Sequence, residues 1–116
     1  MITKELILKQ AKKKDMRLVY ELRLSDMKIE KLENLEDLVK LREIDLSGNM
    51  LKEVEQLNCL KELRSLNLSS NAIVLLPPLK FPYLQKLDLS YNALGSMKNL
   101  SLFKVPAENV LSATRE

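Results

Sequence analysis

The chain has 116 residues, of which 46% are hydrophobic and 30% charged, with a formal net charge of +3 at pH 7. This length corresponds to one domain or part of one. Because the chain has no histidine, a single cysteine and only two glycines, it excludes His-based acid–base catalysis, a thiolate zinc site and a Gly-rich phosphate loop. We therefore predict a protein that is not an enzyme and has no cofactor and no metal site.

Residues 1–15 predict an N-terminal helical cap. Thr3 is placed to serve as the N-cap, and four residues, three of them apolar, recur after it at helical spacing without an intervening Gly or Pro. Such a helix suits the start of a stacked array, because the outermost unit has no neighbour to cover it. The residues with this spacing are Leu6, Ile7, Gln10 and Ala11.

A run of three lysines, Lys12–Lys14, lies at the end of this cap. Residues 1–23 carry seven Lys/Arg against three Asp/Glu, so the positive charge of the chain is concentrated there. In one interpretation the lysines close the last turn of the helix, where cations are favourable for the helix dipole. In the other they form a nuclear-import or nucleic-acid patch. The lack of interleaved aromatic residues favours the first.

Residues 16–103 repeat one pattern four times. Each copy reads aliphatic-x-x-aliphatic-x-Leu, and the last three continue into Ser-x-Asn-x-aliphatic. A fixed period of this length means that each copy must stack on its neighbours to bury its apolar face. The central positions, which are 22, 22 and 21 residues apart, are Leu22, Ile44, Leu66 and Leu87.

Each copy predicts one strand followed by a crossover. The segment around x-Leu-x-Leu alternates apolar and polar residues, as a half-buried strand does, and parallel strands need crossover connections. Apolar residues at every third position predict 3₁₀-like turns in the crossovers. The third crossover contains three prolines between Leu76 and Tyr83, so we expect an extended connection there. The inward strand residues are Leu22, Leu24, Ile44, Leu46, Leu66, Leu68, Leu87 and Leu89.

An asparagine follows each of the last three strands, at Asn49, Asn71 and Asn92. The backbone loses its sheet partners where a strand bends into a crossover, yet buried N–H and C=O groups must be satisfied. We predict that these amides point inward and bond successive repeats. The first copy has Met27 at this position, so the ladder of amides begins with the second repeat.

These residues resemble the leucine-rich-repeat consensus, Leu-x-x-Leu-x-Leu-x-x-Asn-x-Leu, over roughly residues 2–103. The 22-residue period is similar to the short intracellular subclass, which includes a phosphatase regulatory subunit, an axonemal dynein light chain, ciliary proteins and a spliceosomal A-prime subunit. The opening from Ile2 to Ile7 also resembles the cap of ciliary and spliceosomal members. The resemblance implies an α/β, right-handed solenoid shaped as a horseshoe arc. It implies a parallel sheet on the concave face, short 3₁₀ or irregular crossovers on the convex face and an N-terminal helical cap.

Residues 104–116 depart from this family pattern and predict a tail or a degenerate fifth repeat. Adding one period to Leu87 and Leu89 places Asn109 and Leu111 at inward strand positions. Members of the subclass usually close with a further repeat and a capping segment. We expect a truncated or alternatively spliced chain rather than a divergent native cap, with a poorly covered edge on the fourth repeat.

The outward residues of the strands predict a partner-binding concave face, with Tyr and Arg as anchors because both are enriched in binding hot spots. The alternative is a solvated face whose charges pair with each other, as Arg23 with Asp45 or Arg42 with Glu43, for about 0–1 kcal/mol per pair. The Ser column after the strands is expected to be structural. The predicted partner-binding residues are Tyr20, Glu21, Arg23, Arg42, Glu43, Asp45, Arg64, Asn67, Lys86, Asp88 and Tyr91.

The sequence therefore predicts a non-catalytic intracellular scaffold whose concave face binds a helix or an extended segment of another protein, in a ciliary, cytoskeletal or phosphatase-regulatory role. The alternative is a spliceosomal A-prime-like ribonucleoprotein component that acts through a protein partner. No small-molecule substrate is expected, and direct nucleic-acid binding should be weak.

An intracellular location, in cytoplasm, cilium or nucleus, is expected because the start lacks an apolar signal peptide. No membrane association is expected, since the apolar run Ala72–Leu79 is too short to span a bilayer. Cys59 is expected to be an inert, partly buried thiol.

Overall fold

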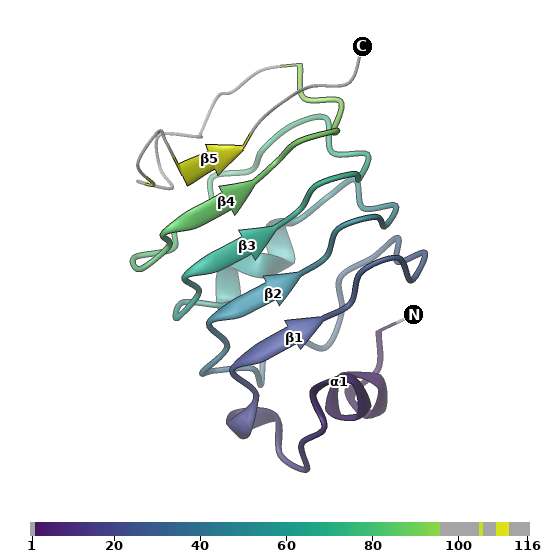
Figure 1. The fold of residues 1–116 in the computed structure, drawn as a ribbon, viewed down its shortest axis with the longest axis vertical. Coiled ribbons are helices and arrows are strands. Elements are labelled where there is room, and N and C mark those ends of the chain that lie inside the picture. The colour runs from purple at the N-terminus through teal and green to yellow at the C-terminus, as the bar shows by residue number, and fades with distance from the viewer. Residues whose placement is uncertain (1, 96–104, 106–108, 112–116) are drawn as a thin grey trace.

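The strands form one parallel sheet in the order β1-β2-β3-β4-β5. The computed structural model describes residues 2–95, 105 and 109–111. Figure 1 shows the strands following one another in chain order, with α1 beside β1 at one end of the stack and β5 at the other. The elements are α1 (Lys4–Ala11), η1 (Met16–Leu18), β1 (Glu21–Arg23), β2 (Glu43–Asp45), η2 (Glu55–Cys59), β3 (Ser65–Asn67), β4 (Lys86–Asp88) and β5 (Val110–Leu111).

The helix α1 begins and ends with recognisable caps. The Thr3 hydroxyl accepts a hydrogen bond from the backbone N–H of Leu6 at 3.1 Å, as predicted. The helix ends at Ala11, and Lys12 adopts a left-handed conformation with φ 58°. The lysine run therefore closes the end of the helix as predicted, since Lys12 donates its N–H to the carbonyls of Leu8 and Lys9, but it does not lie within the last turn. The cation in the last turn is Lys9, and the lysine run follows the helix because Lys12 leaves the helical conformation.

Three kinds of contact attach α1 to the first repeat. Ile7 is completely buried against the core. The Lys4 ammonium lies 2.8 Å from a carboxylate oxygen of Asp37, and the Asn34 amide donates to the Ile2 carbonyl at 2.8 Å. Both polar partners belong to the first crossover, so the cap is held by the crossover side of the repeat as well as by the sheet. The half-buried apolar residues around Ile7 are Leu6, Leu8 and Ala11, whereas Gln10 is exposed.

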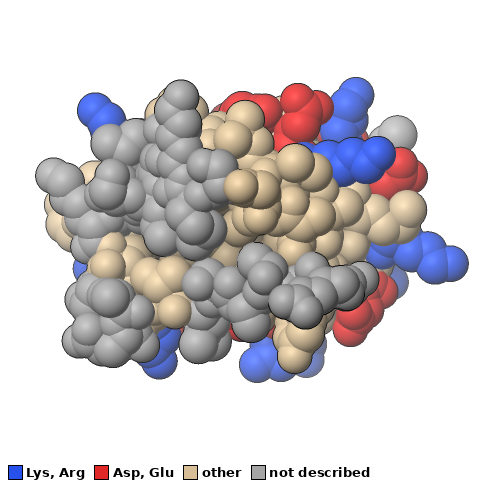
Figure 2. All heavy atoms as spheres, turned by 90° about the horizontal axis from the view of Figure 1, so that it is seen from above, with Lys and Arg blue, Asp and Glu red and all other residues tan. Residues whose placement is uncertain are grey.

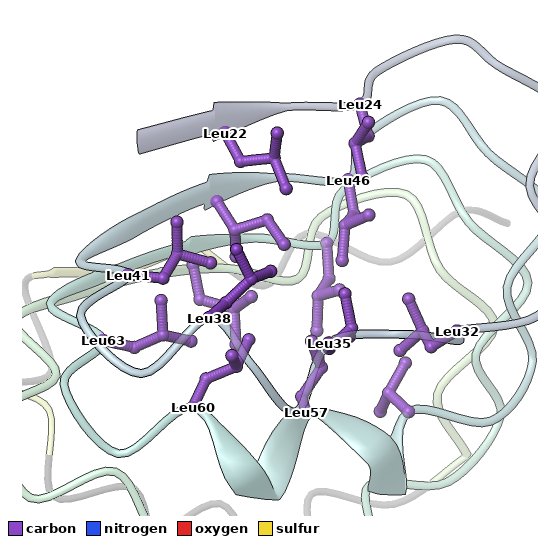
Figure 3. Packing of buried hydrophobic residues seen from close by; sticks show 14 of the residues in the cluster. Leu22, Leu24, Leu32, Leu35, Leu38, Leu41, Leu46, Leu57, Leu60 and Leu63 are labelled. Atoms are coloured by element: carbon purple, nitrogen blue, oxygen red, sulfur yellow. The ribbon is translucent and has the colours of Figure 1, made fainter. Parts of the chain in front are cut away.

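The leucine pattern sets the register of the sheet. Leu22, Ile44, Leu66 and Leu87 lie opposite one another on successive strands. All four are buried, and the most exposed of them, Ile44, has only 3% of its surface exposed. Figure 3 shows that leucines from the strands and from the crossovers point into one common interior. The predicted solenoid and its inward residues are confirmed.

The crossovers differ from repeat to repeat. The second contains the 3₁₀ helix η2, as the spacing of three predicted. The first contains turns in which Leu38 donates to Leu35 at 3.0 Å and Leu41 to Leu38 at 3.3 Å, without a continuous helix. The third, with its prolines, has no helix between Ile73 and Phe81, because proline lacks the N–H that a helical turn requires.

The fifth strand shows that the predicted register of the tail is wrong by one residue. Val110 lies opposite Leu87 and packs against the core, whereas Asn109 had been expected there. Successive residues of a strand face opposite sides, so a shift of one residue exchanges the buried and exposed faces. The shift places an apolar side chain inward in place of a polar one. The remaining tail residues, 104, 106–108 and 112–116, lie outside the described residues.

The asparagine ladder forms as predicted. The Asn49 oxygen accepts from the N–H groups of Met27 and Ile29 in the preceding repeat, each at 3.0 Å. Its amide nitrogen donates to the carbonyls of Leu24 and Leu46, each at 2.9 Å. The side chain thus joins the backbones of two repeats where the strands end. Equivalent bonds are made by Asn71, which accepts from Leu51, and by Asn92, which accepts from Ile73.

The common interior predicts a large effect of truncating one inward leucine. Leu66 lies in the middle of the stack and is 1% exposed. We expect Leu66→Ala to lower the free energy of unfolding by about 2–5 kcal/mol, because it leaves a cavity between two neighbouring repeats. The neighbouring change Ser65→Ala, on the exposed face, should cost less than about 0.5 kcal/mol. Urea unfolding measures both, and equal losses would contradict the assignment of faces.

A second prediction separates two members of the asparagine ladder. Asn49 accepts from two backbone N–H groups, whereas Asn71 accepts from one and is less buried. Each buried group left unpaired costs about 1–3 kcal/mol. We therefore expect Asn49→Ala to be less stable than Asn71→Ala by about 1 kcal/mol or more. Unfolding both variants in urea measures the difference, and an Asn71 variant of equal or lower stability would disprove this account.

Candidate partner-binding face

The exposed face of β1–β4 forms a hollowed surface, which we call the sheet face. A hollow of about 610 Å³ lies over β1–β3 beside the end of α1. A second, of about 380 Å³, runs along the starts of the strands. A third, of about 370 Å³, lies over β3 and β4 and reaches Asn109. Ten of the eleven predicted partner-binding residues lie together on the sheet face. The residues of the sheet face are Tyr20, Glu21, Arg23, Arg42, Glu43, Asp45, Arg64, Ser65, Asn67, Gln85, Lys86 and Asp88.

One row of the sheet face is occupied by internal hydrogen bonds. Asp45 accepts from the backbone N–H of Ser47 at 2.9 Å and from its hydroxyl at 2.6 Å. This arrangement stabilises the bend at the end of the strand. The predicted structural role of the Ser column thus has a specific cause, which the sequence shows only as Asp/Asn-x-Ser. The same pair of bonds joins Asn67 to Ser69 and Asp88 to Ser90.

The predicted ion pairs across the sheet do not form. Arg23 and Asp45 are opposite each other in register, but no ion pair joins them, nor Arg42 and Glu43, among the residues that the structure describes. Asp45 is held by Ser47 instead. The ion pairs found in the described residues, Lys4–Asp37 and Arg17–Asp15, both lie outside the sheet face. The alternative of a self-neutralising face is therefore not what the structure contains.

A row at the starts of the strands combines arginine with tyrosine. The Arg42 guanidinium lies 5.5 Å from the centre of the Tyr20 ring, within the range of a cation–π contact. The Arg64 guanidinium lies 5.9 Å from the centre of the Tyr83 ring. Backbone hydrogen bonds of 2.7–2.8 Å join the row from strand to strand. We call it the rim row: Tyr20, Arg42, Arg64 and Gln85.

Tyr83 was not among the predicted residues. It is 53% exposed and lies two positions before the rim-row residue Gln85, outside the strand pattern. The equivalent residues of the other repeats are Leu18, Lys40 and Glu62, which share no chemistry with it. No periodic signal could therefore have identified it. Its place beside the rim row follows from its contact with the Arg64 side chain.

Tyr91 is separated from the other predicted anchors. It follows β4, at the opposite end of the strands from Tyr20, and is 54% exposed with φ 57°. The same turn position has positive φ in every repeat, and the second repeat has Gly48 there, where an added Cβ would collide with the carboxylate of Asp26. The conformation of Tyr91 is therefore a property of the repeat. The other positions with this conformation are Asp26 and Ser70.

Cys59 lies in η2, on the crossover side. It is exposed rather than partly buried, which corrects the sequence-based expectation. Its thiol donates to the carbonyl of Gln56 at 3.2 Å. Partial desolvation raises the pKa of the Cys59 thiol above its ordinary value, so less of the reactive thiolate is present at neutral pH.

Charges of both signs lie around the edge of the molecule. Figure 2, seen from the end of the stack that carries β5, shows Lys and Arg together with Asp and Glu there. Within residues 2–95, 105 and 109–111, no group of three or more His, Cys, Asp or Glu is arranged to hold a metal ion. No helical segment in that same part of the chain has the length and apolar character that crossing a bilayer requires.

Comparison with known proteins agrees with the fold. Leucine-rich-repeat family models match residues 62–82 and 82–96. A crystal structure of an internalin C2 from Listeria monocytogenes is similar with a TM-score of 0.65 and 23% sequence identity, covering 74% of this chain and 38% of the internalin chain. The chain thus spans less than two fifths of the length of that protein. A comparison with curated proteins gives no significant match.

The chain has a leucine-rich-repeat fold, in which stacked repeats build an extended surface. Its membership of the short intracellular subclass stays a prediction.

Asp45, Asn67 and Asp88, which bond the serines two residues later, form a row that we call the structural row. The bonds between Asp45 and Ser47 predict which substitutions this row tolerates. Asp45→Asn keeps the oxygen that accepts both bonds, as Asn67 does in the third repeat, so its stability should stay within about 0.5 kcal/mol of the parent. Asp45→Ala removes both bonds and should cost about 1–3 kcal/mol. Thermal or urea unfolding tests the pair, and an Ala variant as stable as the Asn variant would show that the row is not structural.

Proposed function

We propose that the chain is a non-catalytic protein-interaction scaffold that binds a helix or an extended segment of another protein on its sheet face. The observation that carries this proposal is the combination of a hollowed face with exposed Tyr20, Arg42 and Arg64 side chains along one edge. Tyr and Arg supply large contact areas and are enriched among residues that dominate binding energy. The hydrogen bonds from Ser47, Ser69 and Ser90 to the Asp and Asn residues of the structural row keep that face rigid.

The partner is intracellular in this proposal, and the chain acts as an adaptor of a ciliary or cytoskeletal assembly or of a phosphatase. Support for this part comes from the 22-residue period and from the start of the chain, which is similar to the caps of ciliary and spliceosomal members. A rigid sheet face suits such adaptors, because a preformed surface loses little conformational entropy when it binds.

A second candidate is an RNA-processing component that joins a ribonucleoprotein through a protein partner. It draws on the exposed side chains of the Lys12–Lys14 run at the C-terminal end of α1. The sheet face offers RNA little, because Glu21 and Glu43 lie side by side on it. Any direct RNA affinity should therefore fall steeply with salt.

The scaffold proposal is tested by blocking the sheet face without changing its charge. Ser65 lies in the middle of the face, between Glu43 and Lys86 in register. Ser65→Trp should weaken binding of a partner by about tenfold or more, since a large side chain then occupies the docking surface. The matched variant Gln56→Trp, on the exposed side of η2, should bind as the parent does.

The measurement begins with affinity capture from a ciliated cell extract, followed by calorimetric titration of the purified partner. Thermal unfolding of both variants controls for folding. Equal binding by the two Trp variants would refute a site on the sheet face. Titration with oligouridylate at low and moderate salt addresses the second candidate, and RNA binding that survives moderate salt would favour it over protein docking.

A further inference from the structure

The two arginines of the rim row are neighbours, and no acidic partner holds either of them among the described residues. The backbone N–H of Arg64 donates to the carbonyl of Arg42 at 2.7 Å, and adjacent strands lie roughly 4.8 Å apart. Neither guanidinium forms an ion pair or a side-chain hydrogen bond within the described residues. Two like charges are thus held side by side with their donors turned to solvent.

Both guanidinium groups are supported from one side by an aromatic ring. Arg42 lies over Tyr20 and Arg64 over Tyr83. Contact with a ring uses the flat face of a guanidinium and leaves its N–H groups, which point outward in the plane, free to donate. Because the rings limit the rotamers of these long side chains, less conformational entropy is lost when an acceptor binds. The pair is therefore prepared for an anionic acceptor.

The surroundings of the pair change in charge across the sheet. In the next row of the sheet face, Glu21 and Glu43 lie opposite each other on β1 and β2. Their counterparts on β3 and β4 are Ser65 and Lys86. Within this row, an anion is therefore repelled over β1 and β2 and attracted at Lys86 on β4. The favourable position lies beside Arg64, where Ser65, Gln85 and Lys86 add further donors in the same hollow.

This pattern distinguishes between kinds of partner. A nucleic acid carries a charge at every phosphate, so a strand that crosses the sheet would also meet Glu21 and Glu43. A protein segment carries separate carboxylates, and neutral or basic residues can follow them over the acidic end. A carboxylate also fits the planar guanidinium in a bidentate arrangement. The charges therefore favour a peptide over a nucleic acid.

We propose that the rim row binds an acidic segment of the partner protein, with a Glu or Asp side chain held between Arg42 and Arg64 and adjacent to Lys86. The residues that follow it, neutral or basic, cross Glu21 and Glu43. This inference rests on the proposed function and adds to it the chemistry of the partner and the direction in which its charges run across the sheet.

The probe for this proposal, called the Glu peptide, has about a dozen residues, with Glu alternating with Ala in one half and Ser alternating with Ala in the other. It is long enough to cross the sheet at roughly 3.3 Å per residue, and its neutral half can lie over Glu21 and Glu43. Its binding to the whole chain is followed by the side-chain Nε–Hε resonances of the arginines. We expect saturable shifts of the Arg42 and Arg64 signals and none of the Arg17 signal. A peptide that alternates Lys and Ala, and oligouridylate, serve as comparisons.

Matched variants make the test specific. Arg64→Gln should weaken binding of the Glu peptide by about tenfold, because it removes a charged donor. Arg17→Gln removes the same charge at an exposed site paired with Asp15, so it should leave the affinity unchanged. Arg64→Lys keeps the charge but not the bidentate geometry and should recover only part of the loss. Thermal unfolding of Arg64→Gln should match that of the parent.

Several results would overturn the proposal. Equal losses in Arg64→Gln and Arg17→Gln would mean that only net charge matters. Tighter binding of the Lys peptide or of oligouridylate would assign the hollow to another partner. A natural partner that is lost with Ser65→Trp but kept with Arg64→Gln would overturn the acidic segment alone and leave the scaffold proposal standing. A partner kept with Ser65→Trp would instead remove the docking site itself.

Discussion

Burial of one aliphatic face per repeat against the next repeat is the constraint from which the rest of the structure follows. A single repeat has only a three-residue strand and a short crossover, too little to enclose its own leucines. When Leu22, Ile44, Leu66 and Leu87 meet in one interior, the strands are forced into a common register. That register also aligns the outward residues in rows. The sheet face is therefore a consequence of how the core packs, and only its residues without a structural hydrogen bond can vary at little cost to the fold.

The polar residues of the repeat divide into two groups for a physical reason. Asn49 and its counterparts, together with one side-chain oxygen of Asp45 and of each of its counterparts, complete the hydrogen bonding of backbone that leaves the sheet. Arg42 and Arg64 precede their strands, where the backbone is already paired across the sheet. Their side chains are therefore not required for backbone hydrogen bonding. Positions of this kind are the ones at which the scaffold can carry binding residues.

This division also explains how far the sequence could be interpreted. The inward leucines and the asparagine ladder were predictable because burial and backbone satisfaction act on every repeat alike and so leave a periodic signal. The register of β5 was not, since Val110 displaces Asn109 through a local gain in apolar burial that breaks the period by one residue. Tyr83 was not predictable either, because its contact with Arg64 occurs in one repeat only. Of the predicted site, ten residues do share one face, but Asp45, Asn67 and Asp88 serve the bends of the strands.

The ion pairs of the described residues lie near the N-terminal end of the array and not on the sheet face. Lys4–Asp37 links the cap to the first crossover, and Arg17–Asp15 lies at the start of η1, where Asp15 is the N-cap. Both pairs satisfy charges at the end of the array, where no further repeat supplies packing. On the sheet face the opposite holds, since Arg23 and Asp45 face each other and yet remain unpaired with each other. Exposed pairs contribute at most about 1 kcal/mol, so the fold loses little by leaving these charges apart. A partner that brings complementary charge to the sheet face meets groups that do not first have to be released from internal ion pairs.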